Sequence, residues 1–254
     1  MAKIVKNTTM VGPLDLLFPH TCRGCGRLGA VVCDCCKKYI LDTSGMKFEC
    51  EVEREKEKNG AKSGDVKAEN GGDRDGENGT SGILKLPAYA AGEREGLLDT
   101  IIHEYKYQSV RAISGVLAEV LQMRFREWGL SELDKTVLVP LPTATNHIRS
   151  RGFDHMRLVA KKLARVLGCK MEMVLTRQKN TVQVGADGNT RVSQAEQAYA
   201  VRPGAKLDPE VTYVLLDDVW TTGASMKAAA KKLLAAGAKK VIIIVIAKSK
   251  LKIS

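Results

Sequence analysis

Two adjacent carboxylates and the small-residue turn after them are the part of this 254-residue sequence best suited to chemistry. Asp217 and Asp218 end an apolar run over 211–216, and the turn 221–225 reads Thr-Thr-Gly-Ala-Ser before an alanine- and lysine-rich helix pattern. Backbone N–H groups at a helix start bind phosphate, and glycine allows close approach. Carboxylates accept hydrogen bonds from hydroxyls. The pattern predicts a cradle for a sugar phosphate. The alternative is an ordinary strand-to-helix turn with surface acids.

The cysteine spacing near the N-terminus predicts a metal site. Cys22-Arg-Gly-Cys25 and Cys33-Asp-Cys-Cys36 each place two thiols three residues apart, and four thiolates are a common ligand set of structural zinc. We expect Cys22, Cys25, Cys33 and Cys36 to bind Zn²⁺, with Cys35 as the ambiguous member. Four sulfur ligands leave no open position for substrate, so the zinc is expected to be structural. The alternative is a set of reduced cysteines without metal.

The composition is typical of a soluble globular protein, and its net positive charge favours binding of polyanions. Hydrophobic residues make up 44% of the chain and the formal net charge is +11. Such an excess favours pyrophosphate-bearing molecules or nucleic acid, although a solvated lysine-rich surface explains it equally well. The longest apolar run, 241–247, is too short to span a bilayer, so we expect a cytoplasmic protein without a membrane span, whose cysteines stay reduced.

The elements that must position these residues alternate along the chain. Helical periodicity covers three segments and buried-strand patterns cover four more. The expected helices are 94–107, 110–128 and 155–167; the expected strands are 136–142, ending in a proline-restrained loop, 170–175, 211–216 and 241–247. Such alternation predicts an α/β fold with a parallel sheet flanked by helices, in which ligands bind at the carboxyl ends of the strands.

Three regions follow from the composition. Residues 1–46 form the zinc-binding N-terminal module, and residues 83–254 form the α/β domain. Residues 47–82 contain many charges, Gly, Asn and Ser but few apolar side chains, which predicts a disordered charged linker. A transient charged helix over 48–58 is the local alternative, and Cys50 within the linker is expected to bind no metal.

The motifs resemble those of the ComF/GntX-like family, competence-associated proteins of the type I phosphoribosyltransferase class. Leu215-Leu-Asp-Asp-Val-Trp-Thr-Thr-Gly-Ala-Ser225 looks like the phosphoribosyl pyrophosphate (PRPP) motif of that class. Val139-Pro-Leu-Pro142, Arg149-x-Arg-Gly-Phe153, and Arg177 with Gln183 and Arg191 also occur in the family's order. The similarity covers most of 20–45 and 83–250. The chain departs from the family pattern at Asp154-His155, where Asn-Gln is usual, and at Gln194.

The resemblance implies a type I phosphoribosyltransferase fold with a small N-terminal zinc-ribbon-like module. It implies transfer of a phosphoribosyl group from PRPP, with Mg²⁺ and with loss of pyrophosphate, to an acceptor that the sequence does not identify. The residues implied to be catalytic are Asp217, Asp218, Arg149 and Arg151. Those implied to bind PRPP are Asp217, Asp218, Val219, Thr221, Thr222, Gly223, Ala224, Ser225 and Lys106, and those implied to lie in a flexible loop over the site are Gln183 and Arg191. The alternatives are solvated surface arginines and a plain mobile loop.

A second function belongs to the same resemblance. A non-catalytic factor in DNA uptake would use the basic surface and the zinc module to bind single-stranded DNA together with competence or recombination proteins. An aromatic content of only 5% offers few stacking platforms for bases. A salvage enzyme acting on a free base is disfavoured because no base-recognition pocket can be identified. His103, His147 and His155 are each more typical of surface or capping residues than of a general base.

Overall fold

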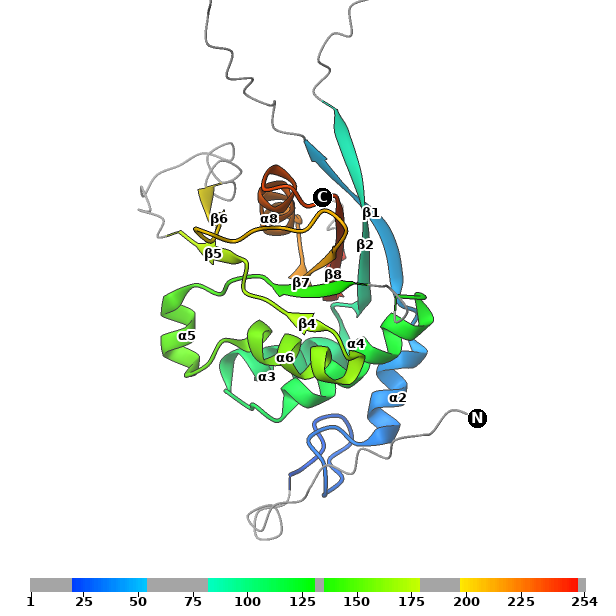
Figure 1. The fold of residues 1–254 in the computed structure, drawn as a ribbon. Helices are drawn as coiled ribbons and strands as arrows, with labels where there is room; N and C mark the ends of the chain where they lie inside the picture. The colour runs from blue at the N-terminus through cyan, green and yellow to red at the C-terminus, as the bar shows by residue number, and fades with distance from the viewer. Residues whose placement is uncertain (1–19, 54–81, 131–134, 179–196, 251–254) are drawn as a thin grey trace, which may run out of the picture.

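The computed structural model describes residues 20–53, 82–130, 135–178 and 197–250. Within these ranges the core is a six-stranded sheet in the order β1-β2-β8-β7-β3-β4 (Figure 1). Its strands are β1 Met46–Glu53, β2 Ile83–Glu93, β3 Thr136–Pro140, β4 Lys170–Met171, β7 Thr212–Trp220 and β8 Lys240–Lys248. The five strands from β2 to β4 pair in parallel, and β1 adds to the edge of β2 in the antiparallel sense.

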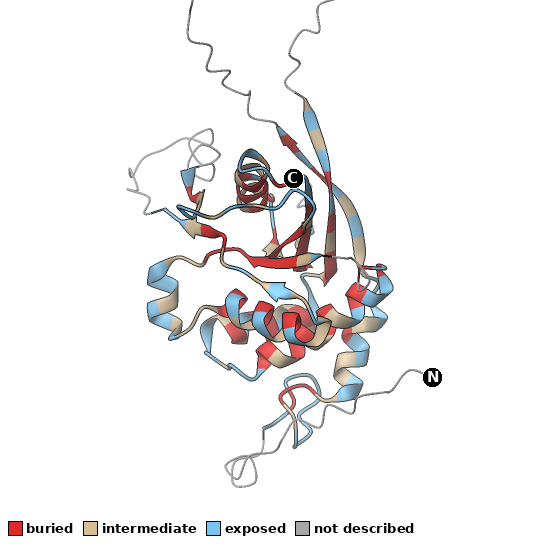
Figure 2. Ribbon diagram, viewed as in Figure 1, coloured by how far each residue is buried: buried red, intermediate tan, exposed pale blue. Residues whose placement is uncertain are grey.

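Helices cover both faces of the sheet, which confirms the expected α/β class. The helices α3 Gly96–Tyr107, α4 Ile113–Glu127 and α6 His155–Leu167 cover one face, and α2 Asp34–Asp42 packs beside α4. The other face carries α8 Ala224–Ala235 and the hairpin of β5 Leu175–Arg177 and β6 Tyr199–Val201. Buried residues concentrate between these layers (Figure 2). In the described part of the chain, no helix is long and apolar enough to cross a membrane.

The strand that leads to the acidic pair is longer than the sequence pattern indicated. The side chains of Val214 and Leu216 lie in the core under α4 and α6, and Tyr213 and Leu215 lie in the core under α8. The apolar run was expected to end the strand, but β7 continues through both aspartates to Trp220. It continues because β8 also extends and supplies backbone partners as far as the Trp220–Lys248 pair.

The start of the predicted linker is wrong, because β1 occupies Met46–Glu53. Phe48, Cys50 and Val52 face the core, with Cys50 only 1% exposed, while the charged residues between them face outward. This period-2 pattern fits a half-buried edge strand rather than the charged helix considered over 48–58. Residues 54–81, the remainder of the predicted linker, lie outside the described residues.

Two further segments differ from the expectation. The strand predicted over 170–175 is divided between β4, which stays in the main sheet, and β5, which leaves it to pair with β6. The segment after Pro142, expected to be a loop, includes the short helix α5 Thr145–Arg151, which ends at Gly152 in a left-handed conformation, φ 75°. Helix 155–167 begins and ends as predicted, because Asp154 caps it and Gly168 terminates it.

Candidate functional site

The acidic pair lies at the carboxyl end of β7, beyond the last residue that pairs with β3. Successive residues of a strand point to opposite faces. Asp218 therefore points toward α3 and α6, where it contacts Lys106 and His155, and Asp217 points toward the α8 side. The two acids, expected to act as one sugar-binding pair, therefore have separate environments.

Asp218 is held by two donors from different helices. Its Oδ1 lies 2.8 Å from Nζ of Lys106 on α3, and its Oδ2 contacts Nε2 of His155 on α6. Burial alone would raise the pKa of Asp218, but the hydrogen bond from His155 and the charge of Lys106 outweigh it and lower the pKa. This carboxyl group is therefore ionised and fixed in orientation.

Asp217 has the opposite electrostatic character. Its Oδ1 accepts a 2.9 Å hydrogen bond from the backbone N–H of Asp218. Burial and the neighbouring negative charge of Asp218 raise the pKa of Asp217, and Lys106 and Arg177 offset that rise only in part. A ligand that donates hydrogen bonds or brings positive charge to this carboxylate would relieve a cost that the folded protein otherwise carries.

The turn after β7 is shaped by a glycine that cannot be replaced without movement. Gly223 has φ 75° and precedes α8, and a Cβ atom built there would lie 2.2 Å from the ring of Trp220. Thr221 and Thr222 are exposed, and the Thr222 hydroxyl accepts from the N–H of Ala224 at 3.4 Å. The first N–H groups of a helix have no intrahelical acceptor, so this turn presents donors that an anion can use.

The predicted arginines lie in the last turn of α5. Arg151 Nη1 is 3.1 Å from His155 Nδ1, and its guanidinium lies 5.6 Å from the ring centroid of Tyr107. Arg149, on the same turn, is exposed. The connection between α3 and α4 holds the end of α5, since Ser109 Oγ donates to the carbonyl of Arg151 at 3.1 Å.

Two residues near the acids were not assigned a role from the sequence. Arg177 on β5 donates to the hydroxyl of Tyr199 on β6 at 3.0 Å, and the Ser225 hydroxyl also reaches the Tyr199 hydroxyl. Tyr199 thus contacts Ser225 in the turn 221–225, and Arg177 supplies a cation on the side of the sheet toward which Asp217 points. The pairing joins β5 to β6 across residues 179–196, so local sequence gave no signal for it.

His155 is the second residue near the acids without a role assigned from the sequence, although the sequence did contain a signal for it. Its ring is buried and contacts Asp218, whereas a single histidine in a sequence is more typical of a surface or capping residue. The sequence departs from the family pattern at this position, which marked it as a place where this chain differs. Lys106, Arg151 and Asp218 converge with His155 at the site, whereas Gln183 and Arg191 lie outside the described residues.

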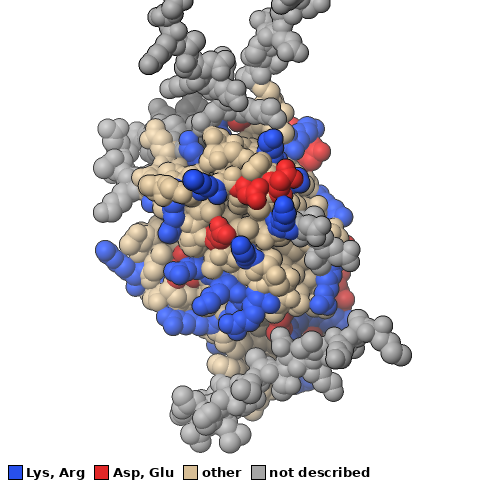
Figure 3. Space-filling model, in the orientation of Figure 1, with Lys and Arg blue, Asp and Glu red and all other residues tan. Residues whose placement is uncertain are grey.

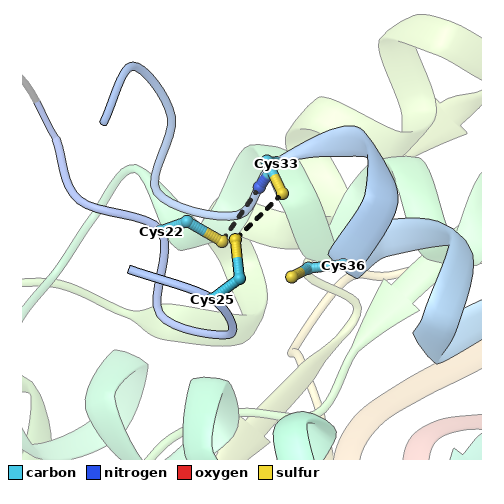
Figure 4. Close-up of side chains that lie close together, drawn as sticks. All are labelled: Cys22, Cys25, Cys33 and Cys36. Carbon is cyan, nitrogen blue, oxygen red and sulfur yellow. Dashed lines mark hydrogen bonds between the residues drawn. The ribbon is translucent and has the colours of Figure 1, made fainter. Parts of the chain in front are cut away.

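The four predicted ligand cysteines lie together on the far side of α3. The Sγ atoms of Cys22, Cys25, Cys33 and Cys36 all lie within 4.8 Å of one another, and those of Cys25 and Cys33 are 3.6 Å apart (Figure 4). A tetrahedron with Zn–S bonds of about 2.3 Å places its sulfurs roughly 3.8 Å apart, so the cluster fits a four-sulfur ion. Cys35 is exposed and is not part of the cluster.

The environment of Cys22 also suits a metal-binding thiolate. Burial acts to raise the pKa of Cys22, but backbone hydrogen bonds from Cys33, Cys25 and Gly24 lower it to about 6. The loop is held against the rest of the protein, because a side chain at Gly24 would meet both Cys36 and Leu97 of α3. These four cysteines could therefore hold a metal ion such as zinc.

A separate hollow in the described part of the chain lies away from the acidic pair. It has a volume of about 570 Å³ and is found at the amino-terminal edge of the sheet, between the starts of β3, β4 and β7. Its lining includes Phe125, Lys135, Glu172 and Tyr213. Since ligands of parallel sheets bind at the opposite, carboxyl edge, this hollow is separate from the acidic site.

One protein-family model matches the part of the chain that contains the acidic pair. Residues 157–252 match the phosphoribosyl transferase domain, and this match includes α6 from Arg157 onward, β7, both aspartates and the turn before α8. A phosphoribosyl transferase domain is therefore present in the chain. The match does not separate the competence-associated family from others. No curated protein matches the sequence.

The solved structures that align with this chain have low sequence identity to it and low TM-scores. Glutamine PRPP amidotransferase from B. subtilis aligns at 15% identity and TM-score 0.38, over 53% of this chain and 26% of that one. Adenine phosphoribosyl transferase from Trypanosoma brucei aligns at 12% identity and TM-score 0.38, over 64% and 83%. The corresponding enzyme from Leishmania tarentolae aligns at 15% identity and TM-score 0.34, over 54% and 71%. The chain thus spans about a quarter of the first of these proteins.

Proposed function

We propose that this protein binds PRPP with Mg²⁺ and transfers its phosphoribosyl group, with loss of pyrophosphate, to an acceptor still to be identified. One observation carries the proposal: within the matched domain, the end of β7 presents Asp217 and Asp218 directly before the Gly223 turn and the start of α8. Acids for a ribose diol and N–H donors for its 5′-phosphate thus adjoin each other along the chain.

The chemistry assigns a role to each group. Pyrophosphate departure leaves positive charge on the ribose ring, so nearby carboxylates stabilise the transition state electrostatically. Asp217 and Asp218 accept hydrogen bonds from the ribose hydroxyls, and the turn 221–225 binds the 5′-phosphate. Arg149 and Arg151, with the loop after Pro142, bind the leaving pyrophosphate, for which a guanidinium offers paired donors. Mg²⁺ bound to the pyrophosphate oxygens of PRPP would neutralise part of the charge of the leaving group.

Titration calorimetry with PRPP and Mg²⁺ tests the binding step. We expect saturable heat from the wild type, and a loss of affinity of about tenfold or more in Asp217→Asn and Asp218→Asn, because each variant loses a carboxyl group to which the ribose hydroxyls donate. Glu210→Gln is the matched control, since Glu210 is exposed near the amino end of β7. Absence of saturable heat in the wild type contradicts the proposal. Pyrophosphate release with candidate amine acceptors then tests the transfer step.

We further propose that the cysteine cluster holds a structural Zn²⁺ and that the protein acts in the cytoplasm. The tetrathiolate geometry supports the first proposal. A reducing compartment is consistent with seven free cysteines, which supports the second.

A second candidate function is binding of single-stranded DNA, in the context of DNA uptake, on the basic face around α5. Lys and Arg side chains gather across the lower part of the view in Figure 3. Exposed cations in this region include Arg111, Arg149, Arg157 and Lys161. Tyr107 is 67% exposed beside Arg151, which gives one base a stacking surface.

A salt series of filter-binding measurements with oligothymidine tests this candidate. Binding to a cationic face falls steeply as salt rises, because each neutralised phosphate releases a counterion. Tyr107→Ala should weaken binding by about fivefold or more, since stacking on one base contributes about 1–3 kcal/mol. The control is Tyr39→Ala, an exposed tyrosine on α2. Equal retention of both variants and of the wild type excludes Tyr107 as the stacking residue.

A further inference from the structure

His155 occupies a buried position that a capping residue does not require. It begins α6, its relative exposure is 5%, and its carbonyl accepts from the hydroxyl of Tyr105 at 2.7 Å. Both ring nitrogens have polar neighbours, with Arg151 and Thr143 at Nδ1 and Asp218 at Nε2. Asp154, rather than His155, supplies the cap of the helix.

The neighbours of the ring define where its proton lies. The guanidinium of Arg151 only donates, so Nδ1 of His155 must accept at 3.1 Å. The hydroxyl of Thr143 has its own acceptor, Oδ1 of Asp154 at 3.1 Å. The proton of the neutral ring therefore lies on Nε2 and is donated to Asp218, which as a carboxylate only accepts.

This tautomer links two groups of different predicted roles. Arg151, the proposed pyrophosphate ligand, orients the ring of His155, and the ring orients one oxygen of Asp218. Lys106 orients the other oxygen from α3. With both oxygens fixed, the carboxylate plane of Asp218 is set before any ligand arrives.

We propose that His155 is a positioning residue, whose Nε2–H, favoured by Arg151 at the other ring nitrogen, holds the Asp218 carboxylate in the orientation that accepts the ribose hydroxyls. The inference rests on the proposed PRPP-binding function and deepens it. His155 acts through Asp218 and does not itself touch the ligand. Its geometric role is one that a glutamine side chain can reproduce, because the amide nitrogen donates and the amide oxygen accepts.

The first test compares substitutions at position 155 in the full chain by calorimetry with PRPP and Mg²⁺. His155→Leu fills the space but removes both hydrogen bonds, and we expect it to weaken binding about tenfold or more. His155→Gln should restore affinity to within about threefold of the wild type. The matched control, His103→Leu, alters an exposed histidine of α3 and should leave affinity unchanged. Equal affinities of wild type and His155→Leu overturn the inference, as does a glutamine variant as weak as the leucine variant.

The second test requires no substrate. Nuclear magnetic resonance of histidine labelled with nitrogen-15 distinguishes the two neutral tautomers, and His155→Gln assigns the signal. We expect an Nε2–H tautomer in the wild type, and a loss of that preference only when both neighbours that favour it are removed, in Arg151→Ala/Asp218→Ala. An Nδ1–H tautomer overturns the inference even if PRPP binds. If the wild type fails to bind PRPP, the proposed function falls with the ribose-positioning role, while the tautomer still reports whether the His155 ring donates to Asp218.

Discussion

Asp217 and Asp218 are neighbours in sequence with opposite effects on folding. The pKa of Asp217 is raised by burial and by the charge of Asp218, so the folded state binds its proton more tightly than the unfolded state does. Stability is then lost as pH rises above the ordinary range of an aspartate. The pKa of Asp218 is lowered despite burial by His155 and Lys106, so its contribution is present at neutral pH and is lost as pH falls.

The corresponding substitutions should therefore shift stability in opposite directions. At pH 7–8 we expect Asp217→Asn to raise the thermal midpoint by about 2–4 °C, the change that about 1 kcal/mol produces in a protein of this size. The gain should shrink as pH falls toward 4 and should vanish only below the pKa of an unfolded aspartate, where the carboxyl group is protonated in both states. Asp218→Asn should destabilise by about 1–3 kcal/mol at neutral pH, because Lys106 loses its partner. Calorimetric melting across this pH range measures both; a destabilised Asp217→Asn at pH 8 contradicts the argument.

Gly223 is expected to be more sensitive than other glycines with positive φ. Gly223→Ala combines backbone strain at φ 75° with a Cβ placed 2.2 Å from the Trp220 ring. Gly129→Ala has a similar φ of 71° and no heavy atom within 4 Å of the new Cβ, so it isolates the strain. We expect about 1–2 kcal/mol of destabilisation for Gly129→Ala and a further 1–3 kcal/mol for Gly223→Ala. Urea unfolding measures the difference, and equal losses would show that Trp220 moves freely.

At the scale of elements, β1 supports the turn that carries the predicted phosphate site. Phe48 on β1 packs edge-on against Trp220 with ring centroids 5.0 Å apart, and Trp220 packs against Gly223. Cys50 and Val52 continue the same face under α8. An edge strand far from the acids in sequence thus helps to hold the loop that follows them.

Removing the Phe48 ring should loosen that loop. We expect Phe48→Ala to lower stability by about 1–3 kcal/mol and to shift tryptophan emission toward longer wavelength as water reaches Trp220. The control is Glu51→Ala, which truncates an outward-facing residue of the same strand. Emission and stability unchanged in Phe48→Ala would show that β1 does not support the turn.

The elements that could be predicted are those with strong local patterns. Helix 155–167 has apolar residues at helical spacing, an aspartate cap and a terminal glycine, and all three are local features. β1 could not be identified the same way, because eight residues with alternating charges lie at the edge of a stretch rich in polar residues. Its assignment depends on pairing with β2, which follows after residues 54–81.

The residues of the candidate site fall into the same two groups, those in local motifs and those brought together by tertiary packing. The acids, the Gly223 turn and the cysteine spacing are contiguous motifs, so the sequence located them. His155 lies 63 positions from Asp218, and Arg177 meets Tyr199 only because β5 and β6 pair. Contacts of this kind depend on tertiary packing, which local periodicity does not report.

At the scale of the whole molecule, the cysteine cluster is connected to the acidic site through α3. Arg23 Nε, beside the cluster, lies 2.9 Å from Glu104 Oε2 on α3, and Lys106, two residues further along the same helix, contacts Asp218. Lys37 on α2 contacts Glu119 of α4 at 2.8 Å. The loop that carries the cysteine cluster is therefore packed against the helices that cover the sheet.

Removal of the metal should destabilise the protein as a whole. We expect one zinc per chain in the wild type and in Cys35→Ser, and loss of the metal in Cys36→Ser. A chelator should lower the thermal midpoint by about 5–15 °C in a single transition, because an ion bound only to the folded state stabilises it by mass action. Metal analysis and scanning calorimetry measure these effects. Zinc retained by Cys36→Ser but lost from Cys35→Ser would reassign the fourth ligand.

The pairing of β1 with β2 has one more consequence. Glu53 lies opposite Ile83 at the end of that ladder, so the polypeptide departs from the sheet and rejoins it at adjacent points. The free energy of closing such a connection depends only weakly on its length. A reporter or an extra domain can therefore be inserted between these two positions, or the gene divided there into two complementing halves, while the register of both strands is preserved.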